Sequence, residues 1–184
     1  MTDPAPAPDP AAVAARRMRR LVAVLGGGAL LIAGSLAAIP WFVTRPRPAP
    51  EARFKLLDGR QPSVSELRGQ VLLLNFWSPS CATCMSEKPI LIEFHRRNAR
   101  RGLTMIAVSM SHDRPAEVIE VARERRFPFD VSLDVRGEIA HAFFRTEVTP
   151  TKYLIDRDGQ IVRTMVGHTD FIDLQQRVDG LLRA

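Results

Sequence analysis

Cysteine is scarce in this chain: Cys81 and Cys84 are the only two among 184 residues. A framework of several disulfides is therefore excluded. A structural zinc site is also disfavoured, because it needs two more ligands and there is no second cysteine pair. The four histidines show no metal-ligand spacing; they are His95, His112, His141 and His168. We therefore expect no resident metal ion.

The sequence also lacks a concentrated positive charge in its larger part. Of the net charge of +6, residues 1–50 hold +4, and the other +2 is spread over 20 basic and 18 acidic side chains. The densest basic run, residues 95–101, falls where a helix is expected to end and complements the helix dipole there, although a docking patch is an alternative. No nucleic-acid partner is expected. Flavin and nicotinamide fingerprints are absent, so no cofactor is expected.

Charged residues are missing from one long segment, residues 21–43. About 20 apolar residues suffice to span a bilayer as a helix. Four arginines stand directly before this segment, at positions 16, 17, 19 and 20, which favours a cytoplasmic N-terminus. We expect a single-pass anchor in the inner (cytoplasmic) membrane with the C-terminal domain in the periplasm. A cleaved signal peptide, cut near Ser35-Leu36-Ala37, is the alternative.

Composition divides the remainder of the chain. Residues 1–20 begin with four alternating prolines and have the composition of a disordered cytoplasmic tail. Residues 44–51 are proline-rich and predict an extended linker. Residues 52–184 form the expected folded domain.

Alternating strand and helix patterns in this domain predict an α/β fold with a mixed sheet. A short hairpin is expected over residues 54–64. Strands are expected at 71–76, 103–110, 129–133, 153–156 and 160–166, and helices at 81–101, 115–126, 135–144 and 171–182. The last two strands flank Asp158-Gly159, a strong hairpin signal.

The two cysteines lie at the turn from the strand at 71–76 into the following helix. At a helix N-terminus the dipole and the unpaired N–H groups favour a thiolate, so Cys81 is the expected nucleophile. Cys84 lies one turn on and can displace a mixed disulfide. A structural disulfide is a weak alternative, because so small a ring gains little from loop closure.

The run from Trp77 to Cys84, followed by Pro89 and by Thr149-Pro150-Thr151, resembles the thioredoxin fold. Within that fold, residues 52–184 resemble the membrane-tethered TlpA/ResA/CcmG-type periplasmic thiol–disulfide oxidoreductases. The resemblance implies a helical insert over residues 111–144. It also implies a cis Pro150 that faces the cysteines and, with Thr149 and Trp77, contributes to substrate binding.

Glu87 follows Cys84 by three residues, about one helical turn away on the same side. The resemblance implies that this glutamate handles protons at the cysteines. Thioredoxin instead has an aspartate six residues before its first cysteine, where this chain has Asn75. Since asparagine cannot act as a base, Glu87 is the expected proton acceptor for Cys84. A solvated surface carboxylate is the alternative.

These features predict an enzyme that reduces protein disulfides. The resemblance implies apocytochrome c or copper-site assembly proteins as substrates, and a transmembrane thiol carrier as the electron donor. A disulfide-forming oxidase uses the same motif, and a Cu(I)-binding module could use the same thiolates. A peroxidase is less favoured, because no peroxidatic pattern surrounds Cys81.

Overall fold

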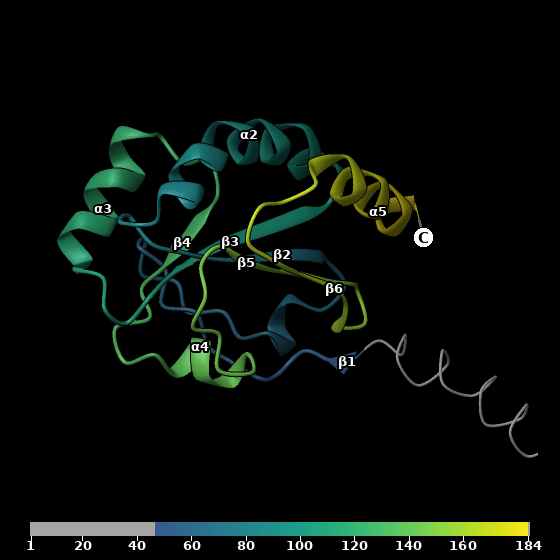
Figure 1. Cartoon of the computed structure of the whole chain (residues 1–184). Coiled ribbons are helices and arrows are strands. Elements are labelled where there is room, and N and C mark those ends of the chain that lie inside the picture. Colours follow the sequence, from purple (N-terminus) through teal and green to yellow (C-terminus); the bar gives the residue numbers. More distant parts are fainter. Residues whose placement is uncertain (1–46, 184) are drawn as a thin grey trace, which may run out of the picture. The chain divides into compact units, whose positions relative to one another are not determined.

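A six-stranded sheet in the order β1-β6-β5-β2-β3-β4 forms the centre of the computed structural model, which describes residues 47–183 (Figure 1). The strands are β1 (Arg47–Pro48), β2 (Val71–Trp77), β3 (Leu103–Ser109), β4 (Asp130–Ser132), β5 (Thr151–Ile155) and β6 (Gln160–Val166). Strands β2, β3 and β4 pair in parallel, whereas β5 runs antiparallel to both β2 and β6. The expected mixed α/β sheet is confirmed.

Helices cover both faces of the sheet. They are α2 (Ala82–Asn98), α3 (Pro115–Glu124), α4 (Glu138–Ala142) and α5 (Phe171–Arg183), with 3-10 turns at Ser65–Leu67 and Ala99–Arg101. Figure 1 shows α2, α3 and α5 on one face and α4 on the other. Each side has its own hydrophobic core, and the α2 side holds the cysteines.

Strand β2 is buried along its whole length, and its side chains alternate between the two cores. Leu73 and Trp77 point toward the α2 side, while Leu74 and Phe76 point toward α4. This explains why the strand reads as a continuous apolar run, as parallel strands covered on both faces do. The strand therefore places the turn that follows it at the carboxyl end of β2, between β5 and β3.

The helix expected at 135–144 is shorter than the sequence pattern suggested. It begins after Gly137, which has a φ of 70°, and the Asp134 carboxylate accepts hydrogen bonds from the N–H groups of Ile139 and Ala140. Phe144 adopts a left-handed conformation (φ 58°) just beyond the helix. The positive φ values at both ends, which a helix does not tolerate, limit α4 to five residues.

The hairpin expected at 54–64 is present, although neither of its arms is regular enough to form a named strand. Backbone hydrogen bonds join Phe54 to Pro62 and Leu56 to Arg60, and Arg53 and Ser63 form an antiparallel bridge. Leu56 also makes an isolated bridge to Ser132 of β4. The segment thus extends the sheet edge and covers the α4-side core with Phe54 and Leu56.

The N-terminal part of the described chain also lies on the sheet. Residues 47–51 belong to the expected linker, yet Arg47–Pro48 forms β1 beside β6, and Ala49 N–H donates to the Gly159 carbonyl over 2.8 Å. Packed structure thus extends to residue 47. Within residues 47–183 no helix is long and apolar enough to cross a bilayer. The tail and the anchor expected at 21–43 lie outside the described residues.

Candidate active site

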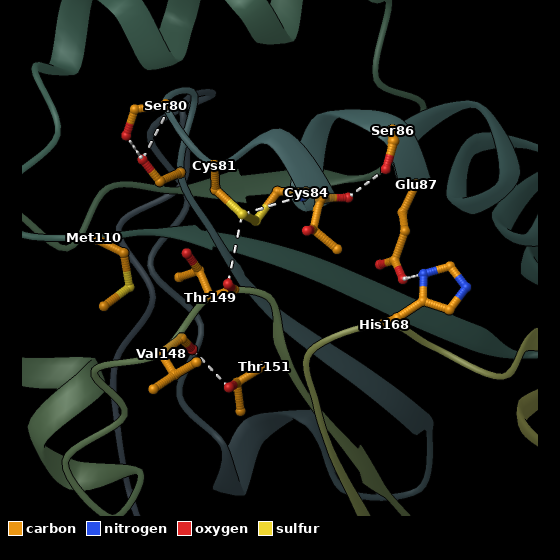
Figure 2. Close-up of a disulfide and its surroundings, with 12 residues drawn as sticks. Ser80, Cys81, Cys84, Ser86, Glu87, Met110, Val148, Thr149, Thr151 and His168 are labelled. Carbon is orange, nitrogen blue, oxygen red and sulfur yellow. Dashed lines mark hydrogen bonds and ion pairs between the residues drawn. A yellow bond between two sulfur atoms is a disulfide. The ribbon is translucent and has the colours of Figure 1, made fainter.

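Cys81 and Cys84 form a disulfide at the junction of β2 and α2 (Figure 2). Cys81 is the N-cap of α2, and its Sγ accepts the backbone N–H of Cys84 over 3.1 Å. Cys81 is partly exposed, whereas Cys84 is 1% exposed and belongs to the α2-side core. This asymmetry makes Cys81 the sulfur that an incoming disulfide can reach, and it places a donor where a thiolate would form.

The peptide bond between Thr149 and Pro150 is cis, as the resemblance implied. Pro150 directly precedes β5, and the Thr149 carbonyl oxygen lies 3.5 Å from Cys81 Sγ. Figure 2 shows Thr149 next to the disulfide, with Val148 farther from it and beside Thr151. Val148 is 57% exposed. The segment therefore offers both backbone groups and an apolar side chain to a peptide that approaches Cys81.

Trp77 lies beneath the site rather than on its surface. The indole has no exposed surface and packs edge-on against Phe127, with ring centres 5.4 Å apart. The role in substrate binding expected of Trp77 therefore requires correction, because a side chain without exposed surface cannot contact a docked peptide. Its position at the end of β2 makes it support for the cysteine turn.

A hydrogen-bond network holds the turn in front of Cys81. The Ser78 hydroxyl donates to the Asp113 carboxylate over 2.5 Å and also lies 2.9 Å from the Ser80 hydroxyl. The second Asp113 oxygen accepts the N–H of Met110 over 2.8 Å. The turn before the nucleophile is thereby tied to the loop that follows β3, an arrangement that the sequence analysis did not anticipate.

Glu87 is buried, with 1% exposure. Its Oε1 accepts the N–H of Thr169 over 2.7 Å, and His168 Nδ1 lies 3.5 Å from the same oxygen. Its Oε2 accepts from Lys152 Nζ over 2.7 Å and from the Thr169 hydroxyl over 3.4 Å. The alternative of a solvated surface carboxylate does not fit this burial. Figure 2 places Glu87 beside the disulfide, on the side of the His168 loop.

Lys152 brings a second charge into the same interior. The side chain has 0% exposure and reaches Glu87 from β5, where it lies directly across from Asn75 of β2. Burial lowers the pKa of Lys152, and the Glu87 carboxylate opposes that change. The Asn75 amide is itself buried and has no hydrogen-bond partner among the described residues. Polar groups therefore line the sheet under α2 beside the cysteine pair.

Comparison with known proteins agrees with this geometry. The family model described as AhpC/TSA family matches residues 46–164, well over half of the chain. The chain belongs to the AhpC/TSA family. Among curated proteins it is similar to the thiol-disulfide oxidoreductase ResA of Geobacillus thermodenitrificans, with 25% identity over 72% of this chain and 75% of the relative. It is also similar to the thioredoxin-like protein YneN of Bacillus subtilis, with 28% identity over 71% and 76%.

A candidate thioredoxin from Neisseria meningitidis has a similar solved structure. Its TM-score is 0.69 and its identity 34%, and the match covers 76% of this chain and 92% of that one. The thioredoxin-like fold is thus confirmed. Together with the disulfide and the relatives, it makes this AhpC/TSA family member a thiol–disulfide oxidoreductase.

The structure brings together the cysteines, Pro150 and Glu87, which the sequence singled out, but the sequence did not reveal the partners of Glu87. Lys152 and Thr169 lie 65 and 82 positions away from it. One signal was available: Lys152 occupies an inward position in the apolar strand Thr-Lys-Tyr-Leu-Ile, where a lysine needs a buried partner. Lys88, also buried, gave a similar signal on the inward face of α2.

The unequal exposure of the cysteines predicts unequal thiol reactivity. After reduction of the full-length protein, iodoacetamide at neutral pH should alkylate Cys81 at least about tenfold faster than Cys84, because thiolate character and access control the rate. Mass spectrometry of quenched samples measures both rates. Equal rates, or faster labelling of Cys84, would contradict the assignment of Cys81 as the nucleophile.

The buried ion pair predicts a strong coupling in stability. Lys152→Met should destabilise the protein by about 3–5 kcal/mol, because it leaves the Glu87 carboxylate buried without its counter-ion. The double variant Glu87→Gln/Lys152→Met should recover much of that loss. Urea unfolding of the single and double variants measures the coupling. Glu93→Gln, which removes an exposed pair with Arg97, is the control and should have little effect.

Proposed function

We propose that this protein is an extracytoplasmic reductase that cleaves disulfides in other proteins. The observation that carries the proposal is the asymmetric pair, with Cys81 accessible beside the Thr149 carbonyl and Cys84 buried behind it. An accessible nucleophile with a protected resolving thiol is the arrangement that a dithiol reductant needs.

The reaction proceeds by two exchanges. The Cys81 thiolate attacks one sulfur of the target disulfide, the target S–S bond breaks, and a target thiolate leaves. Cys84 then loses its proton and attacks Cys81 Sγ, which releases the second target thiolate and closes the Cys81–Cys84 disulfide. Two electrons pass from the pair to the target, and the departing thiolates take up protons. Glu87, one turn beyond Cys84, is proposed to assist this proton transfer.

Membrane attachment is part of the proposal. Residues 21–43 would anchor the chain in the cytoplasmic membrane, and the four arginines before them favour a periplasmic location of the catalytic domain. Cysteine-containing proteins that must be kept reduced there, such as apocytochrome c before haem attachment or copper-site assembly proteins, are the proposed substrates. A transmembrane thiol carrier would return the pair to its dithiol form.

A trapping experiment tests the reaction and identifies the substrate. Cys84→Ser should accumulate mixed disulfides through Cys81 that dissociate on addition of dithiothreitol, because the resolving step is blocked. Cys81→Ser should accumulate none and lose all exchange activity. Mass spectrometry of the adducts names the partner. Failure of Cys84→Ser to form such adducts would refute the reductase proposal.

The direction of exchange follows from the midpoint potential of the pair. A reductase should lie nearer to the about −270 mV of thioredoxin than to the about −120 mV of a strong disulfide-forming oxidase. Equilibration of the full-length protein with dithiothreitol or glutathione buffers measures this value. A potential close to that of the strong oxidase would instead assign the protein to disulfide formation.

The anchor makes a separate prediction. The full-length protein should fractionate with membranes and resist extraction by carbonate or high salt, since a transmembrane helix is not released by charge screening. Immunoblots of the fractions and N-terminal sequencing of the mature protein measure this. A mature N-terminus near Ala38 would show that the segment is a cleaved signal peptide.

A further inference from the structure

Lys88 is a buried amine that the exchange reaction described above does not use. It lies on α2 four residues after Cys84, so the two residues are neighbours on one face of the helix. The side chain is 1% exposed, and its Nζ has no hydrogen-bond partner among residues 47–183. Nζ lies 3.8 Å from the centre of the Trp77 ring and 5.0 Å from that of Phe127.

These surroundings disfavour a permanent charge on Lys88. An unpaired ammonium is costly to bury, and attraction to an aromatic face recovers only part of the lost hydration. Burial lowers the pKa of Lys88 well below its ordinary value, and the nearby Lys152 charge lowers it further. Glu87 opposes this change, but both of its oxygens are already engaged by Lys152 and Thr169. The other titratable group beside Glu87 is the exposed His168.

We propose that Lys88 is a redox-linked proton acceptor: an uncharged amine while the Cys81–Cys84 disulfide is closed, and an ammonium once the pair is reduced. The proposal deepens the function proposed above, because it requires that the pair cycle between disulfide and dithiol. It does not depend on which protein is the substrate, nor on the direction of net exchange.

The chemistry balances with a dithiol as the reductant. The dithiol reductant gives up two electrons and two protons and becomes a disulfide, and the Cys81–Cys84 S–S bond breaks. The two sulfurs then need up to two protons. One proton goes to Cys84, and the second goes to Lys88 Nζ rather than to Cys81, so that the site holds one thiolate, one thiol and one ammonium. The net charge of the site is unchanged.

A negative charge on the cysteine pair provides the reason for the switch. The Cys81 thiolate lies seven residues before Lys88, about two helical turns or roughly 10 Å along α2, and at an effective dielectric of about 20 opposite charges at that separation still interact appreciably. The thiolate formed on reduction therefore favours protonation of Lys88. The ammonium in turn favours the Cys81 thiolate. We expect it to raise the Cys81 thiolate fraction about tenfold, equivalent to one unit in the pKa of the Cys81 thiol. Lys88 thus acts on the reaction indirectly, by stabilising the negative charge of the Cys81 thiolate.

The chain permits a direct test, because it contains only three lysines: Lys55, Lys88 and Lys152. In full-length protein carrying 13C-labelled lysine, the Cε signals report the charge of each amine. At neutral pH the Lys88 signal should be that of an amine in the oxidised protein and that of an ammonium after reduction with dithiothreitol. The exposed Lys55 should remain an ammonium in both states. Lys88→Met and Lys55→Met assign the signals.

Two measurements on Lys88→Met extend the test, with Lys55→Met as the matched control. The first is the Cys81 thiolate fraction of the reduced protein, followed by absorbance at about 240 nm or by alkylation rate. At pH values below the thiol pKa, this fraction should be about tenfold smaller in Lys88→Met. The melting temperature of the oxidised protein should rise at neutral pH, because the variant no longer buries an unpaired amine. A role limited to packing on Trp77 predicts a lower melting temperature and unchanged thiol titration.

The lowered pKa of Lys88 also determines how the folding stability changes with pH. The pKa of Lys88 is lowered in the folded state, so unfolding takes up a proton at pH values between the folded pKa and the unfolded value of about 10.4. Wild-type stability therefore rises with pH across that window, and the advantage of Lys88→Met shrinks.

Three results would overturn the proposal. They are an ammonium at Lys88 in both redox states, an amine in both states, and an unchanged Cys81 titration in Lys88→Met. Failure of the underlying redox chemistry is distinguishable, because thiol counting would then show that dithiothreitol does not open the Cys81–Cys84 disulfide at all.

Discussion

The ion pair between Glu87 and Lys152 is the constraint on which the geometry of the site depends. It joins α2 to β5 through two buried side chains, and the hydrogen bond from the Thr169 N–H to Glu87 also ties in the segment that leads into α5. Cys81 is the N-cap of helix α2, and β5 begins directly after Pro150. A contact between this helix and this strand therefore sets how the nucleophile faces the cis-proline segment.

Much of this arrangement could be predicted from local sequence. The apolar run of β2, the cysteine spacing and the Asp158-Gly159 turn each define an element from a few neighbouring residues. The boundaries of α4 could not be predicted, because they follow from the Asp134 carboxylate and from the left-handed conformation of Phe144. Apolar patterning carries no information about either feature.

The contacts of Glu87 and Lys88 could not be predicted for a different reason. Helical spacing places Glu87 and Lys88 beside Cys84, but it does not say whether that face meets the core or the solvent. The answer depends on β5, which follows Glu87 by more than 60 residues and pairs antiparallel with β2. The hypothesis of a surface carboxylate was reasonable from the local pattern, and only the register of β5 excludes it.

Several polar groups are buried under α2 near the cysteines. Asn75 and Lys88 have no hydrogen-bond partner within residues 47–183, and Lys152 is paired with the Glu87 carboxylate. Apolar side chains of similar volume would be more stable at such positions, since unpaired polar groups cost free energy to bury. Pure packing does not explain their presence. A reaction that creates and removes a negative charge on sulfur at every turnover does, because a buried proton-exchanging group near the pair compensates that charge.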